Sequence, residues 1–280
     1  MKITILNENL TYKRGIRCEH GLSLLIQDGQ RQWLFDTGQT DVFLKNAKQM
    51  GVSLENLDGI VLSHGHYDHC GGLETFLREC SRKVPVYVRE EAFEEKYADK
   101  GKAEKENIGI PWKRDMCPEL VTVREKKTGL APGVWLLGNI PYTEGLEDFS
   151  PGMFLLRGGA FEKDPMRDEQ MLVFETDRGL MVFAGCSHPG ILNCLHYVQE
   201  SFPGKKIYGL LAGMHLMHAG DRRIDWTIRQ LEAYDIEALM PVHCTGIRAI
   251  SRIREHFPEK YRKAECGDVI RLETAADINN

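Results

Sequence analysis

The residues best suited to chemistry lie in one short stretch, SHGHYDHCGG at 63–72. Within it, His64, His66 and His69 supply three imidazoles and Asp68 supplies a carboxylate, all inside six residues. Imidazole and carboxylate groups are common ligands of divalent metals, and the neighbouring glycines allow a loop to turn tightly enough to bring the groups together. The stretch directly follows an apolar, strand-like run. The spacing therefore predicts a site for one or two metal ions.

A metal site of this kind predicts hydrolysis. Two divalent ions about 3.5–4 Å apart would lower the pKa of a bridging water and polarise the group under attack. Metal-bound hydroxide would then be the nucleophile at neutral pH, so that no side-chain nucleophile is required.

Four more candidate groups stand at or just past the ends of strand-like runs: Cys186, His188, His215 and His243. Catalytic groups and ligands gather at the carboxyl ends of strands in open α/β sheets. A Cys186 thiolate would favour zinc or iron over magnesium, although a small buried strand-end residue is the alternative. His215 could polarise a substrate or donate a proton to a leaving group, and equally could be a structural histidine. We expect His215 and Asp68 to be the catalytic side chains.

The elements that would position these groups alternate between strands and helices, which predicts an α/β fold. In the first half, residues 22–26 and 32–36 flank an Asp28-Gly29 turn and predict a hairpin. A helix at about 40–50 and a buried strand at 59–63 follow. In the second half we expect helices near 190–200, 223–234 and 247–256, and strands at 207–213 and 237–242.

The two halves share one short pattern. LLIQDGQRQWLFDTG at 24–38 and LVFETDRGLMVFAGC at 172–186 each read as strand, polar turn, strand and small-residue loop. If this is a repeat, Asp36 and Cys186 occupy equivalent strand ends. Two mixed sheets would then pack face to face with helices outside, giving a four-layer αββα sandwich. Asp36 is expected either to orient a ligand imidazole or to cap the turn after it.

The motif H-x-H-x-D-H after a strand, with FDTG at 35–38, resembles the metallo-β-lactamase superfamily. More narrowly, the chain resembles the subfamily named for dihydropterin-linked ribofuranosyl-aminobenzene-phosphate synthase, through EHGLSLLI at 19–26, GCSHPG at 185–190, GMHL at 213–216 and PVHCTG at 241–246. The resemblance implies the αββα fold. It also implies that His64 and His66 bind one metal, while Asp68, His69 and His243 bind the second.

The chain departs from the family pattern in two places. Residues 70–187 contain no histidine, so the remaining ligand of the first metal has to come from elsewhere. We favour His188 over a carboxylate of Asp168-Glu169. Cys186 stands where the superfamily usually has a bridging aspartate, and the site would hold a single ion if Cys186 does not bridge. We expect two divalent ions, with zinc favoured and iron or manganese as alternatives.

The composition sets the remaining expectations. A chain of 280 residues with 42% hydrophobic and 28% charged residues predicts one globular domain, 1–280. A net charge of -5 argues against a nucleic-acid partner. The N-terminus has neither a signal-peptide core nor a membrane span, and the eight cysteines are scattered, which favours a cytoplasmic protein with reduced thiols. The charged segment 90–107 predicts a solvated helix or insertion, and 141–170 predicts a long loop.

The predicted function is a metal-dependent hydrolase that acts on a small, phosphate-bearing substrate, either a phosphodiester or a pterin-related compound. The alternatives are a lactone or ester hydrolase, a pterin-linked synthase and a non-catalytic metal-binding module. We expect neither a nucleic-acid nor a membrane partner, and the oligomeric state is open.

Overall fold

The computed structural model describes residues 1–80, 82–99, 101, 104–143, 145, 147 and 152–272. The chain forms two compact units. Unit 1 consists of Met1–Arg124, Ser150–Glu169 and Glu265–Arg271, and unit 2 consists of Glu125–Phe149, Gln170–Ala264 and Leu272–Asn280. The expectation of one domain stays a prediction.

The main sheet of unit 1 has seven strands within the described residues, in the order β17-β1-β2-β3-β4-β5-β8. Their bounds are β1 (Lys2–Asn7), β2 (Ser23–Asp28), β3 (Arg31–Phe35), β4 (Gly59–Val61), β5 (Val86–Arg89), β8 (Leu120–Val123) and β17 (Val269–Arg271). Strands β2 and β3 form the predicted hairpin, and Gly29 between them has φ 60°. Such a turn needs a residue that tolerates positive φ, which is why glycine stands there.

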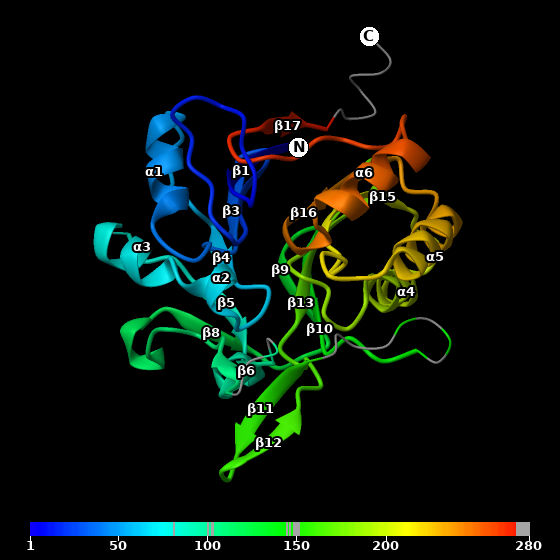
Figure 1. The fold of residues 1–280 in the computed structure, drawn as a ribbon. Helices are drawn as coiled ribbons and strands as arrows, with labels where there is room; N and C mark the ends of the chain where they lie inside the picture. Colours follow the sequence, from blue (N-terminus) through cyan, green and yellow to red (C-terminus); the bar gives the residue numbers. More distant parts are fainter. Residues whose placement is uncertain are drawn as a thin grey trace. The chain divides into compact units, whose positions relative to one another are not determined.

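Helices cover one face of this sheet (Figure 1). Their bounds, with those of two 3-10 helices, are α1 (Val42–Gln49), α2 (Tyr67–Cys70), α3 (Leu73–Glu79), η1 (Glu90–Phe93) and η2 (Arg114–Met116). Phe43 and Ala47 lie one helical turn apart on α1, and both are buried against the sheet together with Phe76 of α3. This apolar stripe, not helix propensity alone, holds α1 in place.

A small second sheet in unit 1 corrects two of the sequence expectations. Its order is β12-β11-β6-β7, with bounds β6 (Lys96–Ala98), β7 (Glu106–Asn107), β11 (Met153–Arg157) and β12 (Ala160–Lys163). Of the two alternatives for 90–107, the solvated helix is wrong, because this segment supplies β6 and β7. Within the predicted loop 141–170, residues Met153–Lys163 form a β-hairpin (Figure 1). The expectation failed because Lys96 is buried, its charge balanced by acidic residues far along the chain.

The sheet of unit 2 has the order β16-β15-β14-β13-β10-β9 in the part of the chain that the structure describes. Its strands are β9 (Lys127–Ala131), β10 (Val134–Gly138), β13 (Gln170–Thr176), β14 (Gly179–Ala184), β15 (Ile207–Gly213) and β16 (Ala238–Val242). Its helices are α4 (Ile191–Ser201), α5 (Asp221–Leu231), α6 (Ile247–His256), η3 (Glu232–Tyr234) and η4 (His243–Thr245).

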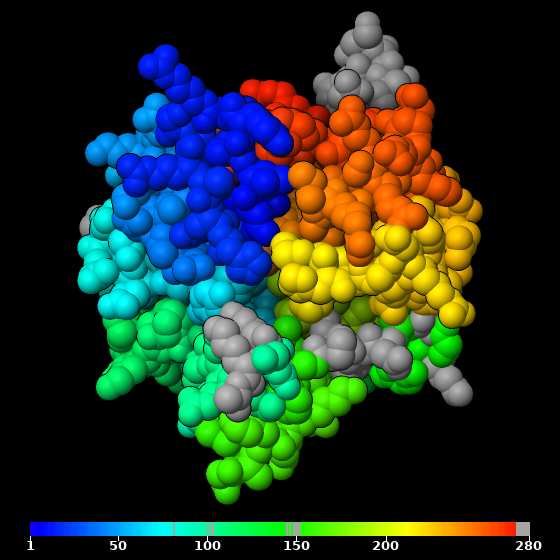
Figure 2. Space-filling view, in the orientation of Figure 1, coloured from blue at the N-terminus to red at the C-terminus, as the bar shows by residue number. Residues whose placement is uncertain are grey.

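The three long helices of unit 2 pack on one face of this sheet through a shared apolar core (Figure 1). Ile224 and Ile228, one helical turn apart on α5, are buried there together with Ile253 of α6. Helices α5 and α6 form adjoining parts of the surface in yellow and orange (Figure 2). The predicted helix at 247–256 and strand at 207–213 are confirmed.

The predicted likeness of the two halves is confirmed at the level of topology. In unit 1 the antiparallel pair β2–β3 is followed by β4, parallel to β3. In unit 2 the antiparallel pair β13–β14 is followed by β15, parallel to β14. Asp36 lies one residue past β3, and Cys186 lies two residues past β14. The two residues thus stand at corresponding strand ends.

Among the described residues, none of the helices is both long enough and apolar enough to span a bilayer.

Candidate metal centre

The histidine cluster of unit 1 occupies the connection between β4 and α2. His64, His66 and His69 are buried, with exposed fractions of 0%, 4% and 0%. Nε2 of His64 lies 3.0 Å from Nδ1 of His66, and the rings of His64 and His69 have centroids 4.2 Å apart. Two nitrogens bound to one tetrahedral zinc at 2.0–2.1 Å would lie roughly 3.3 Å apart. The local chain therefore brings the imidazoles to a spacing that suits a shared metal.

Asp36 orients His69 from the end of β3. Its Oδ2 lies 2.7 Å from His69 Nδ1, and both side chains are fully buried. The backbone N–H and the hydroxyl of Ser63 also donate to the Asp36 carboxylate, at 2.6 and 2.7 Å. A carboxylate on Nδ1 directs the other ring nitrogen, Nε2, towards a metal. Of the two roles predicted for Asp36, the structure supports the orienting one.

Asp68 lies between two histidines. Its Oδ2 is 3.8 Å from Nε2 of His69 and 3.2 Å from Nε2 of His20. The first distance is compatible with Asp68 and His69 sharing an ion, as predicted. Sequence reasoning assigned no role to His20. The only signal available was its place at the start of the EHGLSLLI element, because the contact with Asp68 spans 48 residues.

The electrostatics keep the cluster in a ligand-competent state. Burial lowers the pKa of His64 well below its usual value, and the neighbouring imidazoles of His69 and His66 lower it further. Burial raises the pKa of the Asp36 carboxyl, while hydrogen bonds from His69 and Ser63 act in the opposite direction. A neutral His64 has a lone pair to offer to a cation, which a protonated imidazole lacks.

Asp168, the carboxylate alternative for the missing ligand, already uses both of its oxygens. Oδ2 accepts a hydrogen bond from the backbone N–H of Gly65 at 2.8 Å, and Oδ1 lies 2.9 Å from Nζ of Lys96. Both oxygens of Asp168 are therefore engaged within unit 1.

In unit 2, the candidate ligands gather past the ends of three adjacent strands, β14, β15 and β16. The ligand atoms of Cys186, His243 and Cys244 all lie within 4.8 Å of one another, and all three residues are buried. Cys244 was not singled out by sequence, where it is one of eight scattered cysteines. Two thiols and an imidazole form a donor set that suits zinc or iron.

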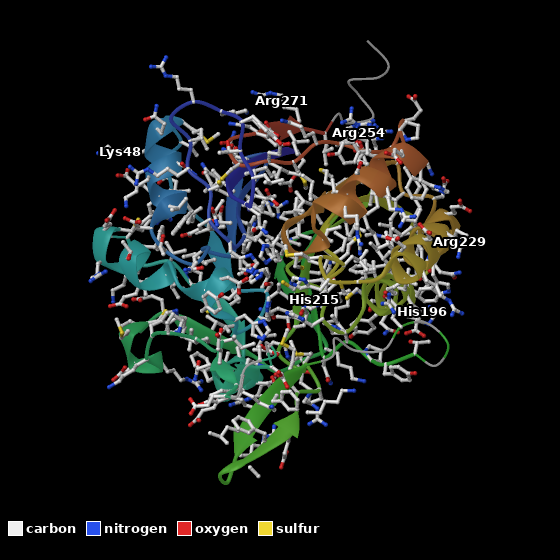
Figure 3. All side chains as sticks on the ribbon, viewed as in Figure 1. Lys48, His196, His215, Arg229, Arg254 and Arg271 are labelled. Atoms are coloured by element: carbon white, nitrogen blue, oxygen red, sulfur yellow. The ribbon has the colours of Figure 1, made fainter. Side chains whose placement is uncertain are left out.

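His188 and His215 lie against each other in unit 2. Their ring centroids are 4.5 Å apart, and His188 is buried while His215 is partly exposed. The backbone N–H of His215 donates to Sγ of Cys244 at 3.3 Å. In Figure 3, His215 lies just past the end of β15, whereas His196 lies on α4. His218 and His256 are exposed.

Four residues at or beside the candidate site adopt a left-handed backbone conformation. Asp36, Ser187, His215 and His243 have φ of 59°, 55°, 49° and 52°, a left-handed conformation that costs free energy for residues other than glycine. Each follows a strand end and turns the chain sharply out of the sheet. Aspartate and histidine tolerate this conformation better than most residues, but the sequence pattern alone does not show which of them adopt it.

The donor groups fit a divalent metal in chemistry as well as in spacing. Unit 1 offers buried imidazoles and the Asp68 carboxylate, and unit 2 offers buried imidazoles and thiols; these nitrogen, oxygen and sulfur donors are the ones that protein zinc sites use.

The chain belongs to the metallo-β-lactamase superfamily: residues 16–202, more than half of its length, match the family described as "Metallo-beta-lactamase superfamily". A solved structure named Tm1679, a metal-dependent hydrolase of the β-lactamase superfamily, aligns with TM-score 0.84 and 32% identity over 97% of this chain and 99% of the other. The predicted metallo-β-lactamase fold is thereby confirmed.

Two relatives come from Methanocaldococcus jannaschii. The first is 7,8-dihydropterin-6-methyl-4-(beta-D-ribofuranosyl)-aminobenzene-5'-phosphate synthase, 29% identical over 96% of this chain and 95% of its own. The second is an uncharacterized protein, MJ0448, 31% identical over 90% of this chain and 94% of its own. The predicted resemblance to the synthase subfamily is confirmed.

Proposed function

We propose that the protein is a metal-dependent hydrolase of small, phosphate-bearing molecules. The observation that carries the proposal is the pairing of Asp36 with Nδ1 of His69, which leaves Nε2 of His69 facing the Asp68 carboxylate at 3.8 Å. A carboxylate that fixes a histidine in this way is typical of metal centres.

The proposed ligands are His64, His66, Asp68 and His69 in unit 1 and Cys186, His188 and His243 in unit 2. Divalent ions held by ligands of these types activate water and polarise the substrate. Two ions are proposed, with zinc preferred because of the thiol and imidazole donors. His215 is the proposed proton donor to the leaving group, since its ring is partly exposed beside His188.

A phosphate-bearing substrate is proposed because paired metals suit in-line displacement at phosphorus. The relative named as a ribofuranosyl-aminobenzene-5'-phosphate synthase adds support, since that compound carries a phosphate. We further propose a cytoplasmic protein whose partner is a small molecule, with no nucleic-acid or membrane partner.

The test begins with elemental analysis of protein purified without added metal. The proposal predicts about two ions per chain. Turnover is then measured on matched chromogenic phosphodiester, phosphomonoester, lactone and carboxylic ester probes. His66→Ala is expected to lose both metal and turnover, whereas His196→Ala, on the partly exposed face of α4, should retain both. Full turnover by His66→Ala would contradict a metal-dependent reaction, and activity on the lactone or ester alone would replace the substrate class.

A synthase activity is the second candidate, favoured by the 29% identical relative over nearly the full chain. A condensation would not consume water. Reactions in ¹⁸O-labelled water separate the two candidates, because hydrolysis places the label in the product and condensation does not. Metal binding without turnover on hydrolytic or pterin substrates would instead support a non-catalytic module.

A further inference from the structure

A buried group of three charges lies directly beneath the histidine turn of unit 1. It consists of Lys96 from β6 and Asp164 and Asp168 from the chain that follows β12, with exposed fractions of 1%, 2% and 0%. Nζ of Lys96 lies 2.8 Å from Oδ2 of Asp164 and 2.9 Å from Oδ1 of Asp168. Burying three charges is costly unless they are well paired, so their retention indicates a specific use.

The contact of Asp168 with Gly65 shows where that use lies. Oδ2 of Asp168 accepts a hydrogen bond from the backbone N–H of Gly65, the residue between His64 and His66. A carboxylate that accepts a backbone N–H and pairs with a buried cation has both oxygens fixed in position. Asp168 thereby fixes the peptide between His64 and Gly65.

Further hydrogen bonds connect Lys96 and Asp168 to neighbouring segments and to the histidine turn. The backbone N–H of Ile108 donates to the carbonyl of Lys96, and the carbonyl of Ile108 accepts the N–H of Tyr67. The buried guanidinium of Arg89 donates from Nε to the carbonyl of Arg167, next to Asp168, at 2.9 Å. The turn is thus held on both sides of His66 by elements distant in sequence.

The turn also has no room to shift towards η1. A Cβ atom on Gly65 would lie 2.3 Å from the carbonyl oxygen of Ala92. The hydrogen bond that Gly65 donates to Asp168 and the close approach of the Ala92 carbonyl together define one position for the His64–Gly65–His66 backbone.

We infer that Asp168, supported by Lys96, is the positioning residue for the His64–Gly65–His66 turn, so that the Lys96–Asp168 pair sets the metal affinity of the site without ligating the metal. The inference rests on the metal site proposed above. Asp164 contacts the same Lys96 ammonium, but its other oxygen, Oδ1, accepts a hydrogen bond from the backbone N–H of Met166 and not from the histidine turn. It therefore offers a matched control.

The experiment compares Asp168→Asn with Asp164→Asn. Each variant removes one carboxylate from Lys96, but only the first alters the group that holds Gly65. Zinc affinity is measured by competition with a chromophoric chelator, and the melting temperature of the metal-free protein is recorded for each. Asp168→Asn should weaken zinc binding by about 10- to 100-fold, the usual effect of losing a group that supports a metal ligand. Asp164→Asn should change it by less than about threefold, even at an equal loss of melting temperature.

A second measurement uses the wild-type chain, so the inference stays testable if Asp168→Asn does not fold. Carbonyl-¹³C-histidine and ¹⁵N-glycine labelling marks the amides of Gly21 and Gly65, the two glycines that follow a histidine. His20→Ala assigns Gly21. The Gly65 amide should exchange slowly with solvent in metal-free wild type and in Asp164→Asn.

Three results would overturn either the positioning role of Asp168 or the proposed function. Fast exchange of Gly65 in the wild type, or equal zinc affinities for the two variants, would overturn the positioning role. A wild-type protein that binds no metal while Gly65 stays protected would overturn the proposed function instead.

The role of Lys96 is tested with a second pair of variants. Lys96→Met should lose zinc affinity, and Lys96→Arg should keep most of it, because arginine keeps the buried charge.

Discussion

Nδ1 of His69 lies 2.7 Å from Oδ2 of Asp36, and neither side chain is exposed to solvent. The pair joins the end of β3 to the histidine cluster. Because Ser63 donates two further hydrogen bonds to the same carboxylate, Asp36 is the point at which the strand end and the metal-binding turn are fixed together.

Replacing Asp36 by asparagine should reduce zinc affinity by about 10- to 100-fold, since the amide keeps the shape but loses the charge that orients His69. Chelator competition measures the change. Asp41→Asn, an exposed carboxylate paired with Lys45, should leave the affinity unchanged. Equal affinities for wild type and Asp36→Asn would show that Asp36 merely caps the turn.

His20→Ala should weaken metal binding by a smaller factor, about three- to tenfold, because its Nε2 supports Asp68 at 3.2 Å from a half-exposed position. His196→Ala is the control: it pairs with Glu200 at a similar exposure but lies on α4 (Figure 3). If both variants behave alike, the contact between His20 and Asp68 has no part in the site.

Cobalt substitution should reveal the thiol ligand. A cysteine thiolate on cobalt gives near-ultraviolet charge-transfer absorption, and Cys186→Ser should abolish it. Cys244→Ala should retain the band, because Sγ of Cys244 donates a hydrogen bond to the carbonyl of Cys186, a contact in which it keeps its proton. A band that survives Cys186→Ser and vanishes with Cys244→Ala would exchange the roles of the two thiols.

Gly65→Ala should destabilise the protein by about 1–3 kcal/mol or more, since the added methyl group would meet the Ala92 carbonyl oxygen at 2.3 Å. Gly220→Ala is matched to it, because a Cβ there meets nothing within 4 Å. Its effect should remain below about 1 kcal/mol. Urea unfolding measures both, and equal losses would mean that the turn can move away from η1.

The stability of the protein should fall in alkaline solution partly through Cys266. Burial raises the pKa of its thiol from 9.0 to about 12. The folded protein therefore keeps a proton that the unfolded chain releases, so the contribution is complete below pH 9 and declines as the pH rises towards 12. The slope for one thiol is about 1.4 kcal/mol per pH unit.

Denaturant unfolding of wild type and Cys266→Ser across this range isolates the thiol from lysines and tyrosines that titrate nearby. The difference in unfolding free energy between the two proteins should shift by that slope in favour of the serine variant. A difference that does not vary with pH would show that the thiol titrates normally in the folded state.

The sequence by itself determined the local parts of this protein. The motif at 63–69 places its imidazole and carboxylate groups within one short segment, so residue types and spacing were enough to predict the cluster. The helix at 247–256 and the hairpin around Gly29 follow from apolar periodicity and turn chemistry. These signals act over a few residues and depend on the periodicity of the local backbone.

Only the tertiary structure decided which distant residues support the cluster. Asp168 reaches Gly65 across 103 positions and Lys96 across 72, and no pattern in the sequence links the three. Lys96 stands in a segment so charged that a solvated helix was the natural prediction. A charge can be buried only where the fold supplies opposite charges and donors, and those partners are chosen by strand order and loop path, which local spacing does not encode.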